Sequence, residues 1–96
     1  MVSTQTLYEG EKRAIEITLT DQDDAVFEPT VVYTTIYNED DEVVRVYQEA
    51  YLTSNRMYDI VDTTVTANTG NYYIVWKIVK SEYIYYHRTS IVVLSL

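Results

Sequence analysis

Residues 71–94 read NYYIVWKIVKSEYIYYHRTSIVVL, and this stretch decides the fold. It holds two runs of β-branched and aromatic residues, the types that fit a pleated, half-buried surface. Only Ser81 and Glu82 separate the runs, which is the spacing of a β-hairpin. Trp76, the single tryptophan, lies in the middle of the first run and shares its parity with aliphatic neighbours. The stretch therefore predicts an antiparallel hairpin with Trp76 packed in a core between two sheets.

The opposite parity of the first run is also apolar, interrupted by a single lysine. The second run carries apolar residues on both parities. A strand that is apolar on both faces is normally covered on both faces, and tyrosine is enriched at protein interfaces. We therefore expect a neighbouring protein to bind an outward face formed by Tyr73, Val75, Lys77, Val79, Tyr83 and Tyr85. The competing interpretation is a set of scattered tyrosines whose hydroxyls contact water.

Alternating segments continue from the hairpin toward the amino end of the chain. Further strands are expected at about residues 4–8, 14–20, 31–37, 43–47 and 57–61. Residues 48–56 are ambiguous, and residues 49–52 are compatible with a helical turn. Seven short strands at intervals of about 8–12 residues predict a single immunoglobulin-like antiparallel β-sandwich over residues 1–96. A small β-barrel is the alternative that fits the same pattern.

The composition argues against several classes of protein. The chain has 96 residues, a formal net charge of −8 and no cysteine, so disulfides and thiolate metal sites are excluded. Proteins that bind nucleic acid cluster Lys and Arg against phosphates, whereas the seven cations here are scattered. No apolar run approaches the roughly 20 residues of a membrane helix, and no secretory signal is visible. We expect a chain made in the cytoplasm, with neither nucleic acid nor membrane as a partner.

Two acidic clusters, neither of which contains a cation, separate the early strands. They hold Asp21, Asp23, Asp24 and Glu28 in one connection and Glu39, Asp40, Asp41 and Glu42 in another. Solvated turn residues are the default interpretation. A calcium site is the second, but the first cluster lacks the glycine that a calcium loop uses for its sharp turn. In the third interpretation, both acidic clusters are docking loops that bind a basic neighbouring subunit, and this binding weakens as the salt concentration rises.

Residues suited to catalysis are sparse. His87 is the only histidine, and Ser90 lies three residues further along the same strand, roughly 10 Å away and too far for proton transfer. The two glycines of the chain, Gly10 and Gly70, do not form a nucleophile elbow. Glycoside hydrolysis needs two carboxylates that face each other across a cleft. Asp59 and Asp62 are the strand acids nearest to one another, but they fall on opposite parities and would point to opposite faces. We therefore expect a protein that is not an enzyme and holds no cofactor and no metal.

Several segments together resemble a known family. They are Ile15–Asp21, Val32–Ile36, the acidic turn before Val43-Val44, and Gly70–Ile78 with its tyrosines and Trp76. This pattern resembles the immunoglobulin-like domains of tailed-phage structural proteins, such as the amino-terminal domain of baseplate upper proteins. The resemblance covers about residues 10–93, although Asp23-Asp24 and Asp41-Glu42 stand where the family often has glycine.

The resemblance implies a structural or assembly protein of a bacteriophage virion, in the capsid, the head–tail neck or the tail. Its partners would be other virion proteins, copies of itself, or both. The carboxy-terminal domains with which longer members recognise host surfaces have no counterpart here, which favours assembly over receptor binding. The alternative is a module that binds carbohydrate or adheres to host surfaces through a platform drawn from Tyr33, Tyr37, Tyr47, Tyr73 and Tyr85. A compact acidic inhibitor is a third possibility.

Overall fold

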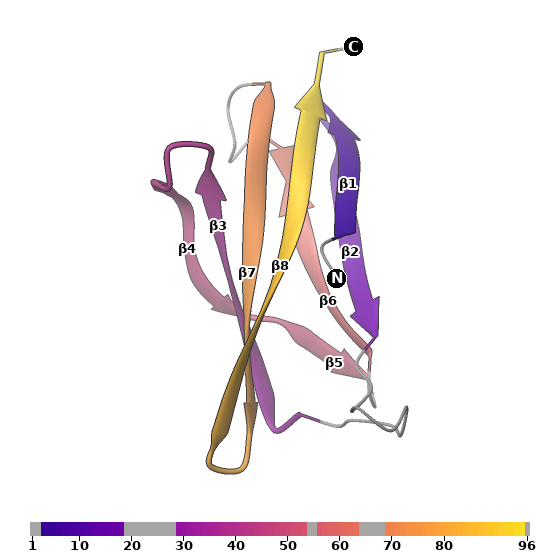
Figure 1. The fold of residues 1–96 in the computed structure, drawn as a ribbon. Helices are drawn as coiled ribbons and strands as arrows, with labels where there is room; N and C mark the ends of the chain where they lie inside the picture. The colour runs from indigo at the N-terminus through magenta and orange to yellow at the C-terminus, as the bar shows by residue number, and fades with distance from the viewer. Residues whose placement is uncertain (1–2, 19–28, 54–55, 64–68, 96) are drawn as a thin grey trace.

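A computed structural model describes residues 3–18, 29–53, 56–63 and 69–95, and these residues form an all-β domain of two sheets (Figure 1). The strands are β1 (Ser3–Tyr8), β2 (Lys12–Thr18), β3 (Val31–Asn38), β4 (Val43–Glu49), β5 (Tyr51–Thr53), β6 (Arg56–Asp62), β7 (Gly70–Lys80) and β8 (Tyr83–Leu94). One sheet has the order β1-β8-β7-β3-β4 and the other β2-β6-β5. Neither sheet closes on itself among the described strands, so the β-sandwich is confirmed and the barrel alternative is wrong.

The strand order is that of an immunoglobulin-like sandwich. Strands β3, β7 and β8 form the middle of one sheet, while β2, β6 and β5 form the other, as in domains of that type. Strand β1 pairs in parallel with β8, from Ser3 opposite Thr89 to Tyr8 opposite Leu94. The remaining pairings between described strands are antiparallel.

The core lies between the sheets and follows the period of two seen in the sequence. Alternate residues of β7 are buried, and Trp76 among them is fully enclosed. Its indole Nε1 donates a hydrogen bond to Thr89 Oγ1 at 3.0 Å, so the polar edge of this large ring has a partner. The placement of Trp76 in the core is therefore confirmed. The buried apolar cluster consists of Leu7, Ile15, Val32, Ile36, Ala50, Met57, Val61, Tyr72, Ile74, Trp76, Ile78, Ile91 and Val93.

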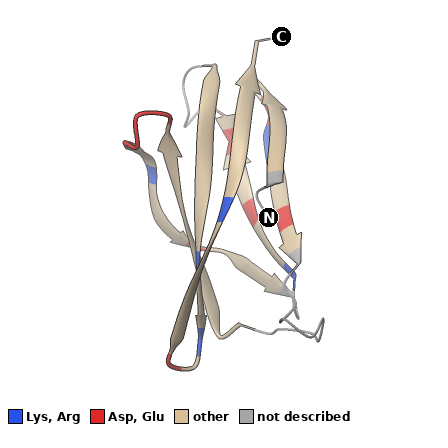
Figure 2. Cartoon of the chain, viewed as in Figure 1, with Lys and Arg blue, Asp and Glu red and all other residues tan. Residues whose placement is uncertain are grey.

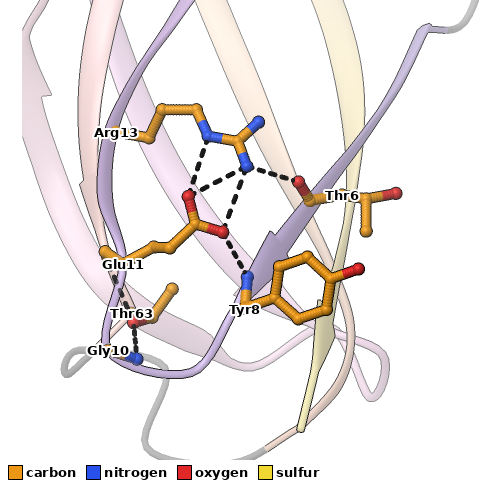
Figure 3. Close-up of polar contacts among 6 residues, drawn as sticks. All are labelled: Thr6, Tyr8, Gly10, Glu11, Arg13 and Thr63. Carbon is orange, nitrogen blue, oxygen red and sulfur yellow. Dashed lines mark hydrogen bonds and ion pairs between the residues drawn. The ribbon is translucent and has the colours of Figure 1, made fainter. Parts of the chain in front are cut away.

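The turn between β1 and β2 joins the two sheets through the carboxylate of Glu11 (Figure 3). This carboxylate accepts a hydrogen bond from the backbone N–H of Tyr8 at 2.7 Å and pairs with the Arg13 guanidinium at 3.0 Å. Arg13 in turn donates to the carbonyl oxygen of Thr6 at 2.8 Å. Gly10 occupies the turn with a φ of 88°, a left-handed conformation that glycine adopts without a steric penalty.

The seven predicted strands are present, and β5 is an additional, eighth strand. The helical turn allowed at residues 49–52 is wrong. Strand β4 ends at Glu49, and the chain crosses at the buried Ala50 from one sheet to the other. The Ala50 N–H donates to the carbonyl of Val32 at 2.8 Å, and β5 then pairs with β6. Hydrogen bonds to strands distant in the sequence therefore determine the conformation of this short segment, and they override its local helical preference.

The β7–β8 hairpin runs the length of the domain, which measures 40 × 21 × 21 Å. Its turn projects beyond the end of the smaller sheet (Figure 1). The sheet that contains this hairpin packs on the smaller sheet with one face only. The opposite, outward face of the larger sheet is the side on which the candidate site lies.

Candidate functional site

The outward face of the larger sheet carries a continuous group of tyrosine and aliphatic side chains. Cross-strand pairs place Tyr33 beside Lys77 and Tyr37 beside Tyr73 on this face. We call the group the tyrosine face, and its members are Tyr33, Tyr37, Tyr47, Tyr73, Val75, Lys77, Val79, Ile84, Tyr86 and Arg88. In the described ranges no second layer packs on this face, and its β7 residues are only partly buried.

Tyr73 is held from three sides. Its ring stacks on Tyr37 with centroids 5.0 Å apart, and the Arg88 guanidinium carbon lies 3.8 Å from the Tyr73 ring centroid. The Tyr73 hydroxyl donates a hydrogen bond to Asp41 Oδ1 at 2.6 Å. This bond raises the pKa of Tyr73 above its usual range, because the neutral hydroxyl is the form that can donate to the carboxylate. The ring is therefore fixed in position before any partner arrives, which reduces the entropy lost on binding.

A second stacked pair extends the face across β3 and β4. The rings of Tyr33 and Tyr47 lie with their centroids 4.3 Å apart and their planes 20° from parallel. Cross-strand aromatic pairs of this kind stabilise a sheet surface and hold its side chains in one arrangement. Tyr47 remains half exposed, so part of the pair is open to a neighbouring molecule.

The structure separates the six residues predicted to share one face. Tyr73, Val75, Lys77 and Val79 lie together on the tyrosine face, and each is half-buried. Tyr83 and Tyr85 pair with Lys80 and Ile78, so they point to the opposite side of the sheet. Directly opposed residues of an antiparallel pair share a face. Because the turn has two residues, odd-numbered residues of β7 stand opposite even-numbered residues of β8.

The tyrosine face is completed instead by two residues that the sequence interpretation missed. Ile84 and Tyr86 stand opposite Val79 and Lys77 and are 52% and 68% exposed. Their signal was present in the sequence, since the spacing of Ser81 and Glu82 fixes which residues oppose one another. The hairpin tip is therefore apolar and exposed on both sides of the sheet.

One of the two acidic clusters borders this face. Glu39, Asp40, Asp41 and Glu42 are all exposed and form the turn between β3 and β4, which appears as the red loop in Figure 2. The Asn38 side chain shapes the turn, because its Oδ1 accepts hydrogen bonds from the N–H groups of Asp40 and Glu42 at 2.9 Å each. The turn thus touches the tyrosine face through Asp41 and Tyr73. The acids Asp21, Asp23 and Asp24 lie outside the described residues.

Residues considered for other chemistry are not brought together. His87 is paired across the hairpin with Trp76 and Ser90 with Tyr73, so the histidine and the serine lie on opposite faces. Burial lowers the pKa of His87, which favours its neutral form at pH 7. Within the described ranges there is no group of three or more His, Cys, Asp or Glu residues able to hold a metal ion.

The five tyrosines considered as a sugar platform are also divided. Tyr33, Tyr37, Tyr47 and Tyr73 lie on the tyrosine face, whereas Tyr85 lies on the other side. The four that share a face are stacked in two pairs, so each ring covers part of another ring. A sugar would meet ring edges and partial faces there, which is a poorer surface than one flat exposed ring.

Comparison of the sequence with models of known protein families finds no match, and comparison with curated proteins finds none either. In the described part of the chain no helix has the length and apolar character needed to cross a membrane. The geometry of the tyrosine face therefore carries the functional argument.

Proposed function

We propose that this chain is a non-enzymatic structural or assembly protein that works by binding other proteins through its tyrosine face. One observation carries the proposal. The outward side of the larger sheet displays tyrosines and valines, and no second layer covers it in the described ranges. Tyrosine and arginine are enriched in protein interfaces, and contiguous exposed apolar surface is typical of interaction sites.

The arrangement of the face supports protein binding over ligand binding. The face is a sheet surface whose rings are already ordered by stacking and by the bond from Tyr73 to Asp41. Ordered aromatic side chains lose little conformational entropy when a partner covers them. Arg88 and Lys77 add positive charge within an otherwise uncharged surface, which would set the orientation of the partner.

The partners proposed are other proteins of a tailed-phage virion, copies of the same chain, or both. The resemblance of Gly70–Ile78 and the earlier segments to phage immunoglobulin-like domains supports this placement, and the strand order is compatible with it. A position in the capsid, the neck or the tail would supply many copies of the binding site. Burial of apolar surface contributes about 25 cal/mol per Å², and a single flat interface must first offset the entropy lost on association. Many copies of the binding site in one particle strengthen the attachment, because later contacts form within the same assembly.

The test compares two single substitutions in the genome that encodes the chain. Val75→Glu places a charge in the middle of the tyrosine face, and Ala14→Glu places the same charge on the exposed side of β2 in the other sheet. We expect purified virus particles to contain the wild-type chain and the Ala14→Glu chain but to lack the Val75→Glu chain. Circular dichroism of each purified variant establishes that both remain folded.

Two results would overturn the proposal. One is the absence of the wild-type chain from particles, and the other is full incorporation of the folded Val75→Glu chain. Saturable binding of the isolated monomer to an oligosaccharide, lost when Tyr47 is replaced by alanine, would favour the carbohydrate-binding alternative.

A further inference from the structure

The first half of β8 forms an open edge of the larger sheet. Strand β1 pairs with β8 only from Thr89 to Leu94, whereas β7 pairs with it from Tyr83 to Val93. Among the described residues, no strand lies beside Ile84, Tyr86 and Arg88 on the side away from β7. An edge of this kind displays backbone N–H and C=O groups that can bind another strand.

Proteins usually protect such an edge, and two of the usual protections are missing here. Proline and bulges are the common devices, yet the β7–β8 register continues without a shift from Gly70 to Lys80. The side chains along the edge are apolar and exposed, with Tyr83 at 59%, Ile84 at 52% and Tyr86 at 68%. An edge that is long, regular, exposed and apolar is therefore suited to accept a strand rather than to repel one.

We propose that this edge pairs antiparallel with the same edge of a second copy of the chain, about a two-fold axis at Tyr85. The occupant follows from the sequence of the edge, which is self-complementary in this register. Tyr83 lies opposite His87 of the second copy and Ile84 opposite Tyr86, and Glu82, the turn residue just before the strand, comes beside Arg88. By symmetry each of these contacts occurs twice, so two pairs of opposite charges flank an apolar centre. Directly opposed charges of unlike sign stabilise antiparallel strands.

Other registers are poorer by the same criteria. A shift of one position would place residues of the tyrosine face against residues of the inner parity, because side chains alternate between faces. A two-fold axis at Tyr86 would set Arg88 against Ile84 and drive Tyr83 against Thr89, where β1 already occupies the edge. An axis at Ile84 would set Tyr86 and His87 against Glu82 and Ser81, which form the turn, so fewer strand residues would pair. The axis at Tyr85 pairs the open part of β8 from Tyr83 to His87 and leaves Thr89 to β1.

The pairing would join two larger sheets into one. Because directly opposed residues of antiparallel strands share a face, the two tyrosine faces would lie side by side on the same surface. The acidic turn of each copy follows β3 and leads into β4, which is the edge strand farthest from the junction. The four acids of this turn therefore lie away from the contact. The inference deepens the proposed function, on which it rests in one respect, because the joined face would be the surface that binds other virion proteins.

Cysteine cross-linking tests the two-fold axis directly, because the natural chain has no cysteine. Directly opposed residues of an antiparallel pair have Cα atoms about 4.5–5.5 Å apart, within the range of a disulfide. We expect Tyr85→Cys to form a disulfide-linked dimer on mild oxidation. Tyr83→Cys is the matched control, since it is at least as exposed but its two copies would lie roughly 13 Å apart along the strands. Equal cross-linking of the two variants, or none of Tyr85→Cys, would contradict the register.

A charge exchange tests the register independently. Glu82→Arg and Arg88→Glu should each weaken dimerisation about tenfold in sedimentation equilibrium, because each creates two contacts between like charges. The double variant Glu82→Arg/Arg88→Glu should recover most of the loss, since the opposite charges face each other again. Failure of the double variant to recover would overturn the proposal.

The outcomes separate this inference from the proposed function. A chain that stays monomeric at all concentrations yet still enters virus particles would overturn the paired edge and leave the tyrosine face intact. If instead the dimer forms normally and the Val75→Glu variant enters particles as well as the wild type does, the role of the tyrosine face is overturned and the paired edge stands.

Discussion

Arg45 and Asp59 form a buried ion pair that joins the two sheets, with 2.5 Å between Arg45 Nη2 and Asp59 Oδ2. The aspartate is fully buried on β6 between Met57 and Val61, and the arginine reaches it from β4. Gln48 Nε2 donates to the other carboxylate oxygen at 3.0 Å. The pair therefore fixes the distance and orientation of two strands that do not share a sheet.

Removal of one member of this pair should be costly. Asp59→Ala leaves the Arg45 guanidinium with little solvent and no carboxylate, and loss of one partner of a buried pair typically costs about 3–5 kcal/mol. Urea denaturation of the wild type and the variant measures the loss. The matched control is Glu16→Ala, which breaks the exposed contact between Glu16 and Arg56 and should cost less than about 1 kcal/mol. Similar losses in both variants would show that the buried pair has no special part in joining the sheets.

The bond from the Trp76 indole to Thr89 predicts the effect of a nearly isosteric change. Thr89→Val keeps the shape of the buried side chain but removes the acceptor, so the indole N–H is left without a partner. An unsatisfied buried donor costs about 1–3 kcal/mol, and thermal unfolding followed by tryptophan fluorescence should show the corresponding drop in Tm. Ser90→Ala, at the next position and on the outward face, should change stability much less. An unchanged Tm for Thr89→Val would contradict the role of this bond.

The hairpin turn offers a stabilising change. Ser81 has a φ of 54°, a left-handed conformation that costs a residue with a side chain about 1–2 kcal/mol. Glycine avoids this strain but loses more chain entropy on folding, so Ser81→Gly should stabilise the domain by about 0.5 kcal/mol. Glu82→Gly, where φ is not positive, should destabilise by a similar amount. Chemical denaturation of the two variants checks both signs, and stabilisation by the second but not the first would contradict the turn geometry.

The cluster around Glu11 predicts how stability responds to acid (Figure 3). The hydrogen bond from the Tyr8 N–H, followed by the bond from Arg13, lowers the pKa of Glu11 below its ordinary value of 4.5. A carboxyl whose pKa is lower in the folded state contributes stability above its unfolded pKa, and this contribution is lost as the pH falls through the folded value. Stability should therefore decrease below about pH 4.5, and Glu11→Gln should decrease less over the same interval. Carboxyl NMR titration of Glu11 with a midpoint above 4.5 would contradict this account.

Much of the fold could be predicted because its strands obey a period of two. Residues 71–94 alone indicated the hairpin and the buried tryptophan, and both are present. Strand β5 was not predicted, because it has three residues and depends on β6 for its bonds. The partner of Asp59 could not be predicted either. Arg45 lies opposite Ile36 next to register shifts between β3 and β4, and the sequence does not show where such shifts occur.

The candidate site was predicted in half. Tyr73, Val75, Lys77 and Val79 lie on one face because they follow a single uninterrupted strand. The prediction for β8, Tyr83 and Tyr85, is wrong, because directly opposed residues share a face and Ile84 and Tyr86 are the residues opposite Val79 and Lys77. The stacking of tyrosines across β3 and β4 depends on tertiary register and could not be predicted from the sequence.

The central claim is that another polypeptide covers the tyrosine face when the protein is in its assembly. The most direct measurement is the rate at which a maleimide labels Val75→Cys in the isolated chain and in purified virus particles, with Ala14→Cys as the control, because the natural chain has no cysteine. The account predicts that Val75→Cys is labelled in the isolated chain and protected in particles, while Ala14→Cys is labelled in both. Equal labelling of Val75→Cys in the two samples would contradict it.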